Sequence, residues 1–189
     1  YDKNNAKLVY YDTIEEAIQL STLNAENEEL SVPADFLNHV DEILHIWNGK
    51  QYDTIFYRAG SDNDPVQGFV IARCKKQVDE ASVQYAFMNA TPVTTKADSI
   101  LISDITELIH SSLKLSDFQQ DLNPNYPDTR FVFGYAHDKE IYSLEVEGQK
   151  PDGVIEINVY DRTMYLWYYD DLKSDKRGNN LSYSVDMPE

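Results

Sequence analysis

The sequence has 189 residues, of which 42% are hydrophobic and 12% aromatic, so it holds enough apolar surface for one medium domain or two small ones. The formal net charge is −17 and the isoelectric point about 4.4, so the surface repels the phosphates of nucleic acids and of anionic lipids. A basic protein or peptide suits such a surface as a partner, and cell-wall material is the alternative.

A single cysteine, Cys74, excludes an intrachain disulfide and a cysteine-rich zinc site. The longest apolar runs, such as residues 69–72, are far shorter than the ~20 residues of a membrane helix, so we expect no membrane insertion within this chain. No signal peptide is visible. Because the chain begins with Tyr1, we expect that a signal sequence, a lipid-anchor cysteine or a purification tag once preceded it.

The first predicted element is a helix near the start of the chain. The polar opening before it predicts a loose arm or a short first strand. The stretch "DTIEEAIQLS" predicts a helix over residues 13–21, because Thr13 and Glu16 form a capping box and apolar residues recur at helical spacing. A further helical turn is predicted to start at Pro33.

From Glu42 the pattern changes to four β-type runs. The first two flank Asn48 and Gly49, the residue pair that best tolerates the positive φ angles of a type I′ hairpin turn. The next two, "VQGFVIARCKK" and "ASVQYAFMNATPV", are separated by the turn-like "QVDE". Such closely spaced strands predict an antiparallel meander with a helix covering one face.

An acidic loop precedes the third of these runs. Its residues Asp62, Asn63 and Asp64 carry the oxygen ligands that calcium prefers. An EF-hand loop counted from Asp62 requires glycine at its sixth position and glutamate at its twelfth. The sequence has Gln67 and Arg73 there, so we interpret the loop as a solvated turn.

The stretch "SDITELIHSSLKL" predicts a second helix over residues 103–114, with Asp104 as its capping residue and a single apolar stripe. The segment after it is polar, contains two prolines and lacks periodicity, so it predicts a linker. We therefore expect a boundary near residue 120. The predicted units are an α+β unit with the meander over residues 1–120 and a small all-β unit with a polar tail over residues 121–189.

The last third predicts four further strands, in "TRFVFGYAH", "EIYSLEVEG", "GVIEINVY" and "TMYLWYYD". Imperfect alternation in the second run predicts a bulge near Ser143. The tail segment "LSYSV" predicts a short edge strand. The predicted fold class is thus α+β, an antiparallel sheet with two helices followed by a small all-β, sandwich-like unit.

The last of these strands carries the candidate binding site. Its residues Tyr165, Trp167 and Tyr169 share one face, because side chains alternate along a strand. If exposed, this row can stack on sugar rings or hold a proline-rich peptide. The alternative is packing on the second face of a buried sheet. We favour packing, because aromatic residues are common in strands for packing alone.

Motifs for catalysis are lacking. No histidine pair has metal-binding spacing, and no Gly-x-Ser-x-Gly motif is present. The seven glycines are isolated, which excludes a phosphate-binding loop. Cys74 lies in a predicted strand, where cysteine is usually a small buried hydrophobe. We predict no catalytic residue, no metal site and no cofactor. The four histidines, no two of which have metal-binding spacing, are His39, His45, His110 and His137.

One phrase, "FVFGYAHDKEIYSLEVEGQ", is followed by a strand of "MYLWYY" type. Over about a quarter of the chain, this part resembles the C-terminal β unit of uncharacterised exported proteins and lipoproteins of Bacillus-like Gram-positive bacteria. The resemblance implies export and a place in the cell envelope, without an activity or site residues. It is carried by Gly134, Asp138, Ile141, Leu144, Val146 and Gly148.

The leading functional hypothesis is a non-enzymatic, extracytoplasmic binding or interaction protein of a Gram-positive bacterium. The alternative is a cytosolic acidic immunity protein or inhibitor that neutralises a basic partner. A third hypothesis is a hydrolase whose carboxylates converge only in the fold.

Overall fold

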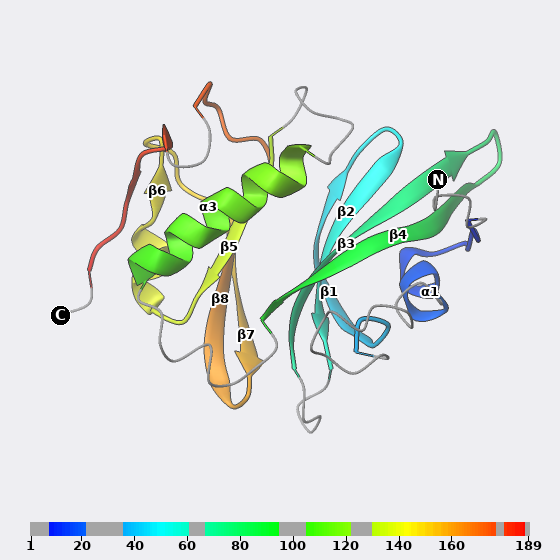
Figure 1. Cartoon of the computed structure of the whole chain (residues 1–189), viewed down its shortest axis with the longest axis horizontal. Helices are drawn as coiled ribbons and strands as arrows, with labels where there is room; N and C mark the ends of the chain where they lie inside the picture. The colour runs from blue at the N-terminus through cyan, green and yellow to red at the C-terminus, as the bar shows by residue number, and fades with distance from the viewer. Residues whose placement is uncertain are drawn as a thin grey trace, which may run out of the picture. The chain divides into compact units, whose positions relative to one another are not determined.

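The computed structural model describes residues 8–21, 36–60, 67–94, 105–121, 130–176 and 180–187. The chain divides into two compact units, Tyr1–Lys96 and Ala97–Glu189. Each unit combines helix with antiparallel strands, so the predicted α+β class is confirmed (Figure 1).

The first unit is built on the predicted antiparallel meander. Its strands follow one another in space as in the sequence, in the order β1-β2-β3-β4 (Figure 1). The middle pair β2–β3 keeps an unbroken register, whereas the pairs β1–β2 and β3–β4 contain register shifts. The strands are β1 (Val40–Asn48), β2 (Tyr52–Ala59), β3 (Gly68–Val78) and β4 (Val83–Thr94).

The turn between β1 and β2 differs from the prediction. Asn48 pairs with Asp53, so the loop is longer than a two-residue type I′ turn, and neither Asn48 nor Gly49 has a positive φ. The buried carboxylate of Asp53 closes this loop instead. Its Oδ1 accepts a hydrogen bond from the Gly49 N–H at 3.1 Å and lies 2.9 Å from Lys76 Nζ on β3.

The helix α1 (Ile14–Gln19) packs against this sheet. As predicted, Thr13 caps it, and the Thr13 hydroxyl accepts a hydrogen bond from the Glu16 N–H at 3.1 Å. Cys74 is fully buried, as its strand position predicts, and this burial raises the pKa of its thiol to about 12. The buried cluster holds Ala17, Ile18, Phe36, Leu37, Ile55, Tyr57, Ala59, Val70, Ala72, Cys74 and Phe87.

Some predicted features fall outside the described residues. They are the helical turn from Pro33, the acidic loop at residues 62–64 and the Asp104 cap. Of the opening stretch, residues 8–11 are described, and Tyr11 forms an isolated antiparallel bridge with Tyr85 on β4.

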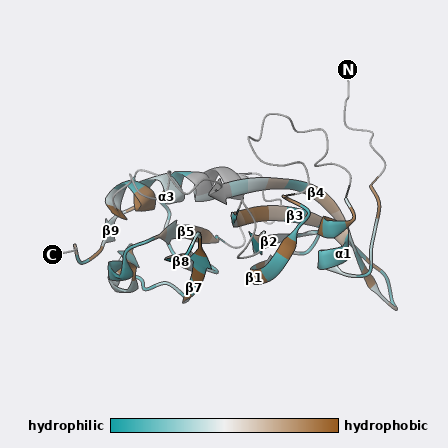
Figure 2. Ribbon diagram, turned by 90° about the horizontal axis from the view of Figure 1, so that it is seen from below, coloured by the Kyte–Doolittle hydropathy of each residue, from teal (hydrophilic) through white to brown (hydrophobic). Residues whose placement is uncertain are grey.

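The second unit packs one long helix on a three-stranded sheet of order β5-β8-β7. Both hydrophobic and hydrophilic residues occur along the helix and along β7 (Figure 2). A two-stranded pair, β6–β9, completes the unit. The elements are α3 (Ile105–Asp121), β5 (Val132–Ala136), β6 (Glu145–Val146), β7 (Gly153–Val159), β8 (Arg162–Tyr169) and β9 (Tyr183–Ser184).

The helix α3 is longer than predicted and falls in the second unit. The sequence placed its end at residue 114 and a unit boundary near residue 120, whereas α3 continues to Asp121 and the division falls between Lys96 and Ala97. A buried serine accounts for the difference. Ser116 Oγ accepts from the Phe133 N–H on β5 at 3.0 Å, and its one proton is shared between the Phe133 carbonyl at 2.9 Å and the Ser112 carbonyl of its own helix at 2.8 Å. A residue that looks like the start of a polar linker is therefore a contact between helix and sheet.

The segment "EIYSLEVEG", predicted as one strand, is a short helix followed by a two-residue strand. Residues Lys139–Ser143 form the 3-10 helix η2, and only two residues of β6 follow. Ile141 and Leu144 are fully buried, so the irregular alternation that predicted a bulge near Ser143 comes from a helical turn. The strand β9, which pairs with β6, confirms the predicted edge strand in the tail.

A type I′ turn joins β7 to β8. Val159 pairs with Arg162, leaving Tyr160 and Asp161 as the turn, with φ angles of 51° and 59°. Two consecutive positive φ angles define this turn, which matches the twist of the flanking strands. Neither Tyr160 nor Asp161 is glycine. The Asn48-Gly49 pair therefore predicted a type I′ turn in the β1–β2 hairpin, whereas the structure has one in the β7–β8 hairpin.

Candidate functional site

The predicted aromatic row lies on β8, the central strand of the second sheet. Trp167 is fully buried and Tyr169 is 2% exposed, both in the cluster that includes the apolar stripe of α3. Met164 and Leu166 on the opposite face are buried as well. Two of the three row residues are therefore packed in the core and present no surface to a ligand, whereas Tyr165 is half-buried.

Trp167 fits into this core because residue 134 is glycine. A Cβ at Gly134 would lie 2.3 Å from Cζ2 of Trp167 and 2.6 Å from the Cβ of Ser112 on α3, distances shorter than atoms in proteins adopt. The missing side chain thus makes room for the indole and for the helix. The sequence singled out Gly134 only through a resemblance.

The hydroxyl of Tyr169 is also engaged inside the protein. It donates to the Gln149 carbonyl at 2.7 Å and accepts from the Val146 N–H at 3.2 Å. Burial is the main cause that raises the pKa of this hydroxyl. The polar tip of Tyr169 therefore fastens β8 to the turn that follows β6.

Tyr165 belongs to a group at the surface that we call the Tyr142 patch, formed by Tyr142, Glu156 and Tyr165. Tyr142 comes from η2 and is 53% exposed, and its ring meets that of Tyr165 edge to face with centroids 5.6 Å apart. Glu156 on β7 lies directly opposite Tyr165 on β8. The Tyr142 hydroxyl donates to Glu156 Oε1 at 2.6 Å.

This hydrogen bond dominates the electrostatics of the patch. It is the largest of the effects that raise the pKa of Tyr142 to about 12, followed by desolvation and by the charge of Glu156. The carboxylate is exposed and keeps further lone pairs for a ligand. Two aromatic rings beside an anionic oxygen form an arrangement that attracts cations.

Sequence reasoning found Tyr165 but missed Tyr142 and Glu156. Tyr142 was assigned to a strand that proved to be η2. The position of Glu156 opposite Tyr165 could have been predicted from the sequence, because counting outward from a turn at Tyr160 and Asp161 pairs these two residues.

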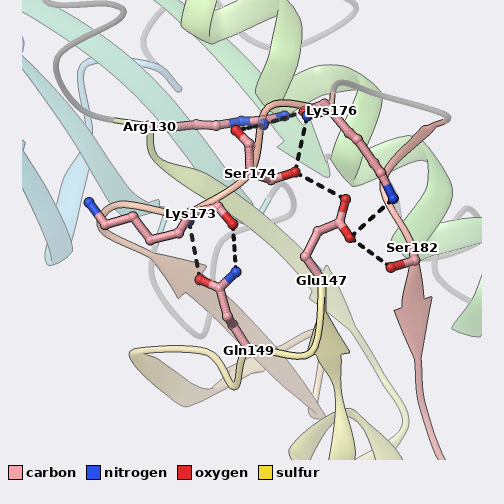
Figure 3. A network of polar contacts seen from close by, with 7 residues as sticks. All are labelled: Arg130, Glu147, Gln149, Lys173, Ser174, Lys176 and Ser182. Carbon is pink, nitrogen blue, oxygen red and sulfur yellow. Dashed lines mark hydrogen bonds and ion pairs between the residues drawn. The ribbon is translucent and has the colours of Figure 1, made fainter.

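A second polar cluster holds the C-terminal segment in place (Figure 3). Glu147, whose φ is 51°, accepts hydrogen bonds from Ser182 Oγ at 2.9 Å and from Ser174 Oγ at 3.1 Å. Lys176 Nζ lies 3.8 Å from the same carboxylate. The bond from Ser182 is the main cause that lowers the pKa of Glu147.

The same cluster includes Gln149 and Arg130 (Figure 3). Gln149 brackets the backbone of Lys173, donating to its carbonyl at 2.7 Å and accepting from its N–H at 3.1 Å. Arg130 donates to the carbonyls of Ser174 and Lys176. These contacts join parts of this chain to one another, so the cluster is a structural clamp.

Nothing in the described ranges gathers the ligands of a metal ion, since their His, Cys, Asp and Glu residues form no group of three or more. His45 meets Trp47 edge to face at 4.8 Å, and His137 Nε2 lies 4.0 Å from Asp138 Oδ2. Searching the same ranges for a helix long and apolar enough to cross a membrane finds none.

No family model matches this chain, and neither a curated protein nor a solved structure matches it.

Replacing Trp167 with alanine tests the role of the row. We expect Trp167→Ala to lower the free energy of unfolding by ~3–5 kcal/mol, because truncating a buried large aromatic side chain leaves a cavity. Urea denaturation followed by circular dichroism measures the change. Tyr165→Ala, at a half-buried position of the same strand, serves as the comparison. A loss below about 1 kcal/mol for Trp167→Ala would contradict its burial.

Replacing Glu156 tests the geometry of the patch. We expect Glu156→Gln to lower the pKa of Tyr142 from about 12 toward the ordinary value of 10.0. The reason is that a neutral amide destabilises the charged phenolate less than the carboxylate does. NMR titration of ring-labelled tyrosine, assigned with Tyr142→Phe, measures this pKa. Glu80→Gln, on the exposed β3–β4 loop, removes the same charge elsewhere and should leave it unchanged. Equal pKa values in the two variants would argue against the hydrogen bond.

Proposed function

We propose that this chain is a non-enzymatic, extracytoplasmic binding protein of a Gram-positive bacterium that recognises a basic protein or peptide. The observation that supports this proposal is the Tyr142 patch, an exposed aromatic ring held beside a carboxylate. The formal net charge of −17 favours a cationic partner over an anionic one.

The patch suits the side chain of lysine or arginine. A cation near a tyrosine ring gains about 0.5–1 kcal/mol at an exposed site. The carboxylate of Glu156 adds a charge-assisted hydrogen bond. Each contribution is small, so specificity requires neighbouring contacts, while the overall negative charge of the chain raises the rate of encounter.

Cell-wall material is the alternative partner. Neutral sugars stack on open aromatic faces and bond to free hydroxyl groups. In the patch the Tyr142 hydroxyl already donates to Glu156, whereas a cation uses the carboxylate directly. The chemistry of the patch therefore favours the basic partner.

The extracytoplasmic location is supported by the sequence resemblance to exported Gram-positive proteins. We expect the product of the complete gene, expressed in a Bacillus-like host, to appear in the envelope or medium fraction. Immunoblotting of cell fractions, with a cytoplasmic enzyme as marker, measures this. Recovery with the cytoplasmic marker would contradict the location and leave the binding proposal open to its own test.

A lysine-rich peptide tests the binding proposal. We expect Glu156→Gln and Tyr142→Ala each to weaken its binding several-fold in isothermal titration calorimetry, because each removes one contact to the cation. The matched control Glu80→Gln, which changes the net charge equally, should bind almost as well as the unaltered protein. Raising the salt concentration should weaken binding in every variant. Equal losses for Glu156→Gln and Glu80→Gln would show that net charge alone attracts the peptide.

A further inference from the structure

We infer that β7 binds an extended segment of the basic partner as an additional strand of its sheet, an inference that rests on the proposed function and specifies how the partner is held. In the order β5-β8-β7, β7 pairs with β8 on one side and is the edge strand on the other. Exposed edges present unpaired backbone groups and are templates for another strand.

The hairpin geometry identifies the outward backbone groups. Residues that flank a two-residue turn exchange hydrogen bonds with each other, so Val159 and Arg162 form such a pair. Every second residue counted back along β7 then directs its N–H and C=O away from β8. These residues are Val154, Glu156 and Asn158. Within the described ranges, no backbone hydrogen bond to them is formed on that side.

The opposite edge of the same sheet is closed. The alternation that directs Glu156 outward on β7 directs Phe133 outward on β5. Both the N–H and the carbonyl of Phe133 are bonded to Ser116 Oγ of α3. The helix therefore occupies the edge at β5, and the described residues leave the edge at β7 open.

The sequence of β7 also lacks the lysine, proline and bulge that often block an edge, and its one charged side chain is Glu156. "GVIEINV" contains neither lysine nor proline and is rich in β-branched residues, which favour strand pairing. Its pairing with β8 is regular from Gly153 to Val159, without a bulge to turn the edge away. By contrast, the edge strands β1 and β4 of the first unit belong to pairs with register shifts, and β4 also bridges to Tyr11.

The side chains of β7 indicate the chemistry of the added strand. Glu156 and Asn158 are exposed on the face that carries Tyr142, whereas Ile155 and Ile157 alternate with them on the other face. Neighbouring strands place side chains of one face together. Basic residues of the partner would thus lie beside Glu156, and apolar residues beside Ile155 and Ile157. The expected occupant is an extended segment in which basic and apolar residues alternate.

Two variants at Asn158 test strand addition with a capped peptide of alternating lysine and valine. Asn158→Pro removes an outward N–H while sparing the bonds to β8, and edge strands tolerate proline there. Asn158→Val keeps the N–H. We expect Asn158→Pro to weaken binding by about tenfold relative to Asn158→Val, measured by calorimetry. Equal affinities for the two variants would overturn the inference.

A second measurement uses the unaltered protein and so does not depend on folding of the variants. The amides of Val154, Glu156 and Asn158 should exchange with solvent quickly in the free protein and slowly with the peptide bound, as NMR hydrogen exchange reports. A peptide with alternate backbone nitrogens methylated, at the same charge, should bind about tenfold more weakly. Unprotected amides, or full affinity of the methylated peptide, would contradict strand addition.

The two proposals fail in different ways. If strand addition is wrong but a basic side chain does bind the patch, Glu156→Gln still weakens binding more than Glu80→Gln does, and the three amides stay unprotected. If Glu156→Gln and Glu80→Gln behave alike, recognition of a cation by the patch is wrong, and the inference that rests on it is overturned as well.

Discussion

The indole of Trp167 lies against the backbone of Gly134, and the second unit is arranged around this contact. A side chain at residue 134 would overlap both the indole and Ser112 of α3, so the helix can approach β5 only over a glycine. The same buried cluster takes in Leu172 and Leu181 from the C-terminal part of the chain. One close approach thus links the helix, the sheet and the tail of this unit.

Burial of β8 restricts where binding can occur. The strand has neighbours on both sides, and its side chains Met164, Leu166, Trp167 and Tyr169 are buried and present no surface to a ligand. Tyr165 is half-buried; Tyr142 meets its ring edge to face, and Glu156 lies opposite it on the neighbouring strand. The proposed binding groups therefore lie at the margin of the sheet, where side chains and the outward backbone groups of β7 occur together.

Local patterns predicted those parts of the structure that local interactions determine. The alternating runs of the meander and the cap at Thr13 followed from neighbouring residues alone. The end of α3 could not be predicted in this way, because Ser116 contacts a strand that is distant in sequence. The residues of the patch could not be predicted either, since Tyr142 reaches Glu156 only because η2 stands in place of the expected strand. Burial of Trp167 was the favoured interpretation of its row, although its contact with Gly134 required the structure.

The place of α3 in the second unit determines how the chain can be divided. A fragment starting at residue 121 would keep every strand of that sheet but lose the helix that covers Val132, Ala136 and Trp167. Those side chains would then face water, and a newly exposed apolar surface of this kind promotes aggregation. A fragment starting at Ala97 retains the helix and therefore the covering of these three side chains.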